Sequence, residues 1–277
     1  MSKPLKVWVR GAGELASGTV VSLHRSGFRV WLSELEYPLA IRRTVCFSDA
    51  VFEGRAAVEE VRGVLAEVGD VPRLLAEGVV PVLIDDPTRI LRLEPDVVVD
   101  ARMLKRDDPS LFRLAPFTVG LGPGFIAGRS CHAVIETMRG HDLGRIIWEG
   151  AASADTGTPG VIGGESERRV LFAPAGGAVS WEVDFGDIVR EGGRLGVVGG
   201  VEIVSKLDGM VRGLISPRVP VTRGMKIGDV DPRGDGVDCH SISDKARAVG
   251  RGVLEAILVH RERSDRREET STGTGEG

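Results

Sequence analysis

Cysteine is scarce in this chain, with three in 277 residues: Cys46, Cys131 and Cys239. So sparse and odd a set excludes a disulfide framework and indicates a reducing compartment. An excess of positive charge is also missing, because 36 Lys and Arg face 40 Asp and Glu; nucleic-acid binding therefore has no electrostatic support. No apolar run approaches the roughly 20 residues of a membrane span, and the early polar residues do not form a secretory signal. We expect a cytoplasmic protein that binds neither nucleic acid nor membrane.

The composition, 42% hydrophobic and 27% charged, is that of a globular protein long enough for two domains. We expect a ligand-binding domain over residues 1–150 and, because small residues dominate 151–166, a linker or extended loop there. Residues 167–260 are expected to form a β-barrel module closed by a helix, and the charged, Thr- and Gly-rich residues 261–277 a disordered tail.

The first half of the chain alternates buried strands with helical segments. Leu5–Val9 is a short apolar run, helical spacing follows until Ser26 and Gly27, and Arg29–Leu32 begins a second strand. Two further apolar runs, Val79–Ile84 and Asp96–Val99, are bounded by Pro, Asp or Gly. This alternation predicts an α/β domain with a Rossmann-like parallel sheet.

A glycine-rich turn joins the first strand to the first helix. Gly11, Gly13 and Ala16 fit the fingerprint of dinucleotide-binding turns, in which small residues let the backbone approach a pyrophosphate. Free N–H groups at the helix start would bind the phosphates. Glu34 stands at the end of the second strand, where the fingerprint places an acid that holds a ribose hydroxyl.

Two features of the same region favour other interpretations. The Glu14 carboxylate lies in the first helical turn, where it would repel a phosphate unless it points away. Arg42 and Arg43 follow soon afterwards and indicate either a further phosphate contact or a solvated helix. The turn therefore either binds a phosphorylated ligand or is a purely structural strand-to-helix connection.

An internal repeat marks the second half of the chain. Placing Ala175–Val198 over Leu207–Val230, at an offset of 32 residues, aligns six identical pairs of Gly or Val. The half-unit Gly186–Leu195 resembles the half-motif of biotinyl and lipoyl domains, which are small barrels. The carrier lysine of those domains is missing from Gly199–Ser205, so we expect a rigid all-β barrel followed by a C-terminal helix from Asp244.

Between the halves, Phe117–His132 runs from a short strand through Gly122 and Gly124 to a Cys131-His132 pair. Glycines after a strand can expose N–H groups to an anion. The thiol and imidazole are candidate catalytic groups, with a buried structural cysteine as the alternative. Cys239-His240 repeats the pair, but adjacent residues of a strand face opposite sides, which argues against a joint zinc site. No metal site is predicted.

Several strings quoted from this chain, "RGAGELASG", "LSELEYPLAIRRTVCFSDAVFEG" and "KIGDVDPRGD", together with "CHAVIETMRGH", resemble the YqeB family. These are accessory proteins of selenium-dependent molybdenum hydroxylase systems. The resemblance extends from about Lys6 to Val259 and implies a maturation role. The positions carried over by it are Gly11, Gly13, Glu34, Arg42, Arg43, Gly122, Gly124, Cys131 and His132.

The resemblance and the glycine turn together predict an accessory protein that binds a dinucleotide, either NAD(P) or a molybdopterin dinucleotide. Its implied partners are a molybdenum hydroxylase apoenzyme or cofactor-maturation proteins, and a homo-oligomer stays open. One alternative is an NAD(P)-dependent oxidoreductase, for which His132 is the available general acid or base. Another is a docking module for a hydroxylase subunit. Whether any reaction is catalysed is not decided by the sequence.

Overall fold

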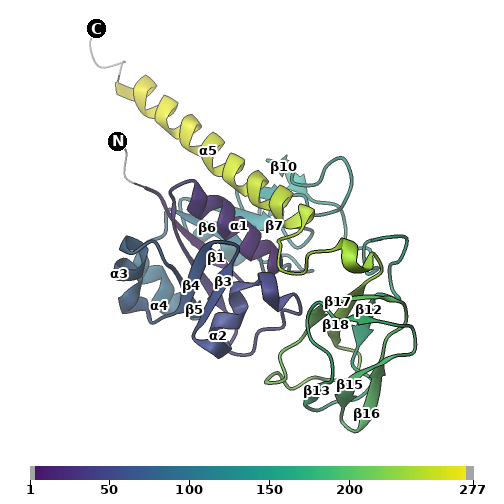
Figure 1. Ribbon diagram of the computed structural model, residues 1–277. Helices are drawn as coiled ribbons and strands as arrows, with labels where there is room; N and C mark the ends of the chain where they lie inside the picture. The colour runs from purple at the N-terminus through teal and green to yellow at the C-terminus, as the bar shows by residue number, and fades with distance from the viewer. Residues whose placement is uncertain (1–3, 273–277) are drawn as a thin grey trace.

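A nine-stranded sheet forms the centre of the computed structural model, which describes the backbone of residues 4–272 and the side chains of residues 4–266 (Figure 1). Its strands, from one edge to the other, are β10 (Ile146–Ile147), β9 (Ala133–Ile135), β7 (Phe117–Leu121), β6 (Val97–Asp100), β1 (Lys6–Arg10), β2 (Arg29–Glu34), β5 (Val80–Ile84), β4 (Val61–Leu65) and β3 (Arg55–Val58). The strands expected from the apolar runs are present as β1, β2, β5 and β6.

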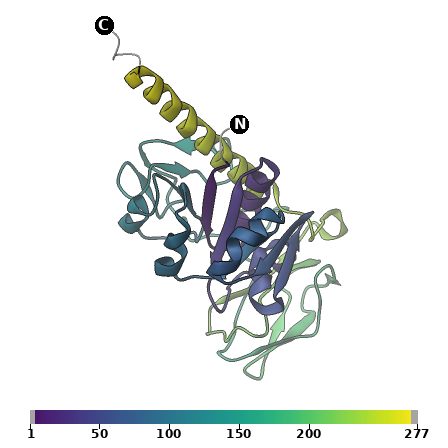
Figure 2. The ribbon, with the colours of Figure 1, turned by 90° about the vertical axis from the view of Figure 1, so that its left-hand side faces the viewer.

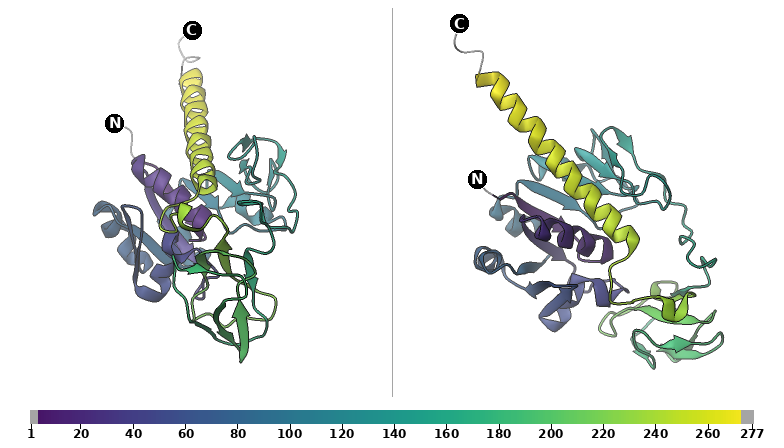
Figure 3. Two further views of the ribbon diagram at one scale, coloured as in Figure 1. Left: turned by 45° about the vertical axis from the view of Figure 1, so that its right-hand side comes forward. Right: turned by 45° about the horizontal axis from the view of Figure 1, so that its top comes forward.

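Both faces of this sheet are buried, which explains the continuous apolar runs. In β1, Val7 and Val9 face a core that also holds Val20 and Val253, whereas Trp8 faces a second core on the opposite side. Helices α1 (Glu14–Arg25) and α5 (Asp244–Thr272) lie side by side on the first face (Figure 3). The shorter helices are α2 (Ala50–Glu53), α3 (Val71–Ala76) and α4 (Pro87–Ile90).

The C-terminal helix packs as its apolar spacing predicted. Ala246, Val249, Val253 and Ile257 are buried against α1 and the sheet. Beyond them α5 projects from the body (Figure 2) and continues to Thr272, into the segment expected to be a disordered tail. Residues 273–277 of that segment lie outside the described residues. Within the described part of the chain, no helix has the length and apolar character needed to cross a membrane.

The second part of the chain holds two antiparallel sheets. One contains β12 (Val170–Phe172), β18 (Lys226–Asp231), β17 (Gly209–Leu214) and β14 (Ile188–Val189). The other contains β13 (Val179–Trp181), β15 (Arg194–Val198) and β16 (Val201–Val204). A further small pair joins β11 (Gly150–Ala151) to β8 (Ile126–Ala127). The 32-residue offset places β15 over β18, so the repeat has a structural counterpart.

The predicted fold class, a Rossmann-like parallel sheet followed by a biotinyl- or lipoyl-like barrel, is wrong. The large sheet is mixed, because antiparallel pairs β3–β4 and β10–β9 form its two edges. The second part is divided between two sheets rather than closed into a barrel. Apolar spacing shows that a segment is a strand but carries no information on its direction or partner, and the short turn at Glu59 (φ 53°) is enough to make β3–β4 a hairpin.

The two antiparallel sheets lie below the carboxyl edge of the large sheet and contact the loop that follows β2 (Figure 1). The Leu214 N–H donates to the Ile41 carbonyl at 2.8 Å, and the Thr44 hydroxyl donates to the Cys239 carbonyl at 2.5 Å. Ile41 also packs into the core of the antiparallel sheets. These contacts hold the second part against the edge where ligands bind in open α/β sheets.

Candidate functional site

A cleft of about 1130 Å³ separates the carboxyl edge of the large sheet from the antiparallel sheets. The start of α1 borders it at Gly13, Glu14 and Leu15. The loop after β2, the loops after β6, β7 and β9, and the segment 153–162 form its other walls. Arg169, strands β17 and β18, and the start of α5 also line it. Both halves of the sequence therefore contribute to one site.

The glycine turn directs the start of α1 into this cleft. Gly11 has a φ of 94°, which favours glycine, and its N–H donates to the Ser33 carbonyl at 2.7 Å. Gly13 is the N-cap and has no capping side chain, so the N–H groups of the first turn lack intrahelical acceptors. A Cβ built on Gly13 meets nothing within 4 Å. The backbone here is accessible to an anion.

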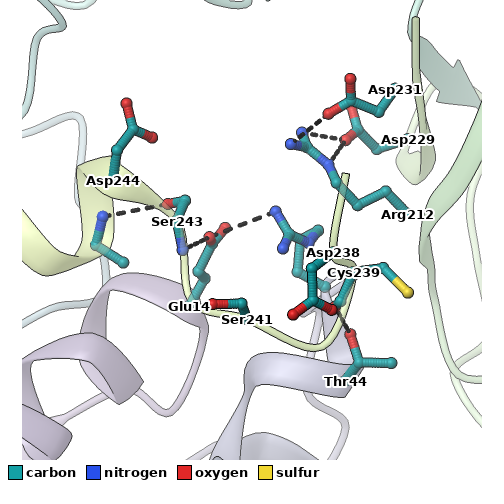
Figure 4. A network of polar contacts seen from close by, with 12 residues as sticks. Glu14, Thr44, Arg212, Asp229, Asp231, Asp238, Cys239, Ser241, Ser243 and Asp244 are labelled. Carbon is teal, nitrogen blue, oxygen red and sulfur yellow. Dashed lines mark hydrogen bonds and ion pairs between the residues drawn. The ribbon is translucent and has the colours of Figure 1, made fainter. Parts of the chain in front are cut away.

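The Glu14 side chain is turned sideways. Its Oε1 accepts from Arg42 Nη1 at 3.4 Å and from the Ser243 N–H at 3.3 Å. Figure 4 shows Glu14 between Ser243, at the start of α5, and the cluster around Arg212. Because Glu14 is held by these groups, its carboxylate need not block the amides of the first helical turn.

Basic side chains predominate around the cleft. Seven of the lining residues are basic and three are acidic. The basic ones are Arg42, Lys105, Arg139, Arg169, Arg212, Lys226 and Lys245, and the acidic ones are Glu14, Asp155 and Asp229. A cleft with one predominant sign of charge concentrates ligands of the opposite sign.

A buried ion-pair cluster forms the floor on the side of the antiparallel sheets. Arg212 donates to Asp229 at 2.5 and 2.8 Å and pairs with Asp231 at 2.7 Å (Figure 4). Arg169 also pairs with Asp229, and Arg233 donates to Asp231 at 2.8 and 2.9 Å. Both aspartates are almost completely buried, so these arginines are largely neutralised by the protein itself.

Glu34 supports the glycine turn and does not line the cleft. Its two carboxylate oxygens accept from the Ala12 N–H at 2.8 Å and from the Leu35 N–H at 2.7 Å. Burial raises the pKa of this carboxyl and the nearby Asp85 charge adds to the effect, while the two backbone hydrogen bonds oppose it. The structure thus gives Glu34 a role in positioning the turn, and the ribose contact stays a prediction.

Glu34→Gln is expected to change the pH dependence of stability. The folded state raises the pKa of Glu34 above its ordinary value of 4.5, so the folded protein binds this proton more tightly than the unfolded chain does. The stability that this proton contributes is fully present below about pH 4.5 and is lost as the pH rises through the raised pKa. The wild type should therefore lose stability relative to Glu34→Gln across that interval. Urea unfolding of both proteins from pH 4 to 8 measures this, and a wild-type advantage that grows with pH would contradict it.

The remaining predicted phosphate contacts divide into two groups. Arg42 lines the cleft, whereas Arg43 pairs with Asp49 at 2.7 Å outside it. Gly122 (φ 79°) and Gly124 are sites of close packing, because a Cβ on Gly124 would lie 2.1 Å from the Leu104 carbonyl oxygen. Between these two glycines, Pro123 lines the cleft. Ala16 is buried beneath the glycine turn.

Cys131 and His132 lie away from the cleft, at the amino end of β9, whereas the cleft borders the carboxyl ends of the strands. The chain returns through β8 before β9 begins, so the glycine-rich segment does not carry these two residues into the cleft. Cys131 is buried in the second core, where burial raises the pKa of its thiol to about 11. A thiol held in its protonated form is a poor nucleophile.

The His132 imidazole is fixed by its own neighbours. Its Nδ1 accepts from the Thr118 N–H at 3.1 Å and lies 2.8 Å from the Thr118 hydroxyl, and its ring stacks on Phe112 with a centroid distance of 4.3 Å. Burial lowers the pKa of this imidazole. The imidazole on which the oxidoreductase alternative relies therefore does not line the cleft.

The sequence analysis missed six basic lining residues: Lys105, Arg139, Arg169, Arg212, Lys226 and Lys245. One of them carried a usable signal, since Arg212 is a charge within the otherwise apolar strand β17. A charged residue in a buried strand position requires a partner or a function. The others stand in polar surroundings, where a basic residue is unremarkable.

Comparison with known proteins gives one close relative. The chain is 47% identical over 255 residues to "Uncharacterized protein YqeB" of Escherichia coli strain K12, which covers 91% of this chain and 47% of that protein. The match supports the predicted kinship, although the chain spans about half the length of this curated relative. No protein-family model matches the chain.

Similarity to solved structures is weak. A succinylglutamate desuccinylase/aspartoacylase from Rhodobacter sphaeroides has a TM-score of 0.26 and 15% identity, covering 83% of this chain and 85% of that one. A xanthine dehydrogenase from Bacillus halodurans has a TM-score of 0.24 and 14% identity, covering 44% of this chain and 31% of that one. TM-scores of this size carry no conclusion about the function of this chain.

Proposed function

We propose that this chain binds a phosphorylated dinucleotide-type ligand in the cleft at the start of α1. One observation carries the proposal: the open amide groups that follow Gly13 face the same cleft as seven basic side chains. Hydrogen-bond donors at a helix start and surrounding positive charge both favour a phosphate group. The large volume of the cleft, about 1130 Å³, suits a ligand of dinucleotide size.

The biological setting of this binding is proposed from kinship. The resemblance to the YqeB family implies an accessory role in the maturation of a molybdenum hydroxylase, whose dinucleotide cofactor is a phosphorylated ligand of this class. The curated YqeB relative is itself described as uncharacterized, so this part of the proposal rests on the family resemblance. NAD(P) and molybdopterin dinucleotides are the two ligand types to compare.

The Gly13→Glu variant tests the ligand site directly. Gly13 has a φ of −70°, which any residue adopts, and its Cβ position is open, so the variant should fold. A carboxylate at this point faces the bound phosphate, and two like charges 4 Å apart repel by about 4 kcal/mol near a protein surface. We expect saturable binding of at least one dinucleotide by calorimetry, weakened at least about 10-fold in Gly13→Glu.

Gly13→Ala is the matched control, because it adds a Cβ at the same open position without a charge or a capping oxygen and should retain binding. Flat titrations with every dinucleotide would refute the proposal. So would a Gly13→Glu protein that binds as tightly as the wild type. Retention of a hydroxylase subunit by Gly13→Glu, without any nucleotide binding by the wild type, would instead favour the docking alternative.

A further inference from the structure

Most cations around the cleft are neutralised by a neighbouring carboxylate. Arg169 and Arg212 pair with Asp229, Lys105 pairs with Asp155 at 2.7 Å, and Arg139 pairs with Asp244. Such pairs leave little net charge for a ligand. Three basic groups differ from them, and they come from segments far apart in the sequence: Arg42, Lys226 and Lys245.

Arg42 is a buried guanidinium with an unused donor. The residue is only 7% exposed, and its Nε makes no hydrogen bond within the described structure. Its one ion pair, from Nη1 to Glu14 Oε1, is long at 3.4 Å. A buried N–H without an acceptor is costly, and such groups are usually satisfied by protein, water or ligand. Because Arg42 also lines the cleft, a ligand there can supply the acceptor.

Lys226, at the start of β18, and Lys245, in the first turn of α5, line the same cleft. Among residues 4–266, neither ammonium group has a hydrogen bond or an ion pair within 4 Å. Burial lowers the pKa of both groups. The charges of Asp229 and Glu14 raise the pKa of Lys226 while Arg169 and Arg212 lower it, and the charges of Arg139 and Lys226 lower the pKa of Lys245 while Glu14 and Glu136 raise it. The two lysines therefore lie within electrostatic range of each other and of the start of α1.

The folded chain thus gathers three cations beside the open amides of α1, and the one ion pair among them joins Arg42 to Glu14, whereas Asp229 and Glu136 act on the lysines only from a greater distance. This leaves about two positive charges without a counterion, an arrangement that destabilises the free protein through like-charge repulsion. Near neutral pH a phosphate monoester and a diphosphate bridge each carry about two negative charges, whereas a carboxylate carries one. The three cations come from three different segments around the cleft, and two linked phosphates offer oxygens to more of them at once than a single phosphate does.

We propose that Arg42, Lys226 and Lys245 clamp the diphosphate group of the ligand against the start of α1. This inference rests on the proposed function and deepens it, because it assigns the ligand class as a diphosphate ester. Lys226 belongs to the antiparallel sheets and Arg42 to the loop after β2, so the bound diphosphate joins the two parts of the chain. Neither lysine belongs to the glycine turn, and two of the three clamp residues come from the second half of the sequence.

The test compares the wild type with the Lys226→Gln, Lys245→Gln double variant by calorimetry, using ADP, AMP and inorganic pyrophosphate as probes. Each hydrogen bond to a charged group contributes about 1.5–3 kcal/mol, so the double variant should bind ADP and pyrophosphate at least about 100-fold more weakly. The preference of the wild type for ADP over AMP should largely disappear. Lys206→Gln, the same substitution at an exposed lysine of the same part, should leave binding unchanged.

The stability of the free proteins provides a second readout. Because the double variant removes two mutually repelling charges, its urea midpoint without ligand should equal or exceed that of the wild type. If the double variant is folded and binds ADP as tightly as the wild type, the clamp is wrong while the proposed function survives. If the wild type itself binds no dinucleotide, no ADP and no pyrophosphate, both proposals are wrong.

Discussion

Arg212→Ala is expected to lower the free energy of unfolding by about 3 kcal/mol, since removal of one partner of a buried ion pair costs roughly 3–5 kcal/mol. The Arg212 residue is 7% exposed and contacts Asp229 and Asp231, which are 2% and 0% exposed. Alanine leaves these carboxylates with fewer positive partners in a place that water does not reach. The loss of unfolding free energy should lie at the low end of this range, because Arg169 remains paired with Asp229 and Arg233 with Asp231.

Arg194→Ala is the matched control for this prediction. Arg194 also pairs with two carboxylates, Glu182 at 2.8 Å and Glu202 at 3.0 Å, and it occupies a strand of the neighbouring sheet. Its side chain is 48% exposed, however, and exposed pairs contribute at most about 1 kcal/mol. Urea unfolding measures both losses, provided that the dependence of the unfolding free energy on urea concentration has the same slope in the variants as in the wild type. Equal losses would show that burial of the charges does not decide the stability of this cluster.

Gly250→Val is expected to separate the two helices that cover the large sheet. A Cβ on Gly250 would lie 2.6 Å from the Gly18 carbonyl oxygen, and a Cβ on Gly18 would lie 2.8 Å from the Ala246 carbonyl oxygen. Backbone therefore meets backbone where α1 crosses α5. Overpacking at such a contact costs about 1–3 kcal/mol or more, and we expect about 3 kcal/mol for valine, which is larger than alanine.

The same variant should also weaken ligand binding, because the start of α5 carries Lys245 and Ser243 into the cleft. Arg251→Val is its control: it adds a β-branched residue one position further along α5, at an exposed site, and should cost only the small difference in helix propensity, about 0.5 kcal/mol. Chemical denaturation and calorimetry together check both consequences. A Gly250→Val protein as stable as Arg251→Val would mean that the helices do not depend on this close approach.

The glycine turn shows how far local sequence can specify a site. The order of strand, two glycines and helix fixed the position of the N-cap at Gly13 and the open amides behind it. The acid expected after the second strand was also found, but Glu34 supports the turn through Ala12. The sequence spacing placed the Glu34 side chain near the turn. Only the fold shows that its carboxylate oxygens already accept hydrogen bonds from the backbone amides of Ala12 and Leu35.

Cys131 illustrates the opposite case. Its position after a glycine-rich segment suggested a reactive loop, but β8 carries the chain back before β9 begins. The thiol consequently enters the second core instead of the cleft. No local pattern distinguishes these two paths, because the outcome depends on which strand the segment pairs with.

The sequence by itself determined the strands β1, β2, β5, β6 and β7, the start of α1 and the helix that begins at Asp244, since apolar spacing and glycine conformation act over a few residues. The tertiary structure alone decided the antiparallel edges, the division of the second part into two sheets, and the meeting of Arg42, Lys226 and Lys245 at one cleft. The direction of a strand and the distance between two charged residues depend on which segments pair in the fold. Such pairing brings together residues about two hundred positions apart, as with Arg42 and Lys245, and it produces no periodic pattern in the sequence.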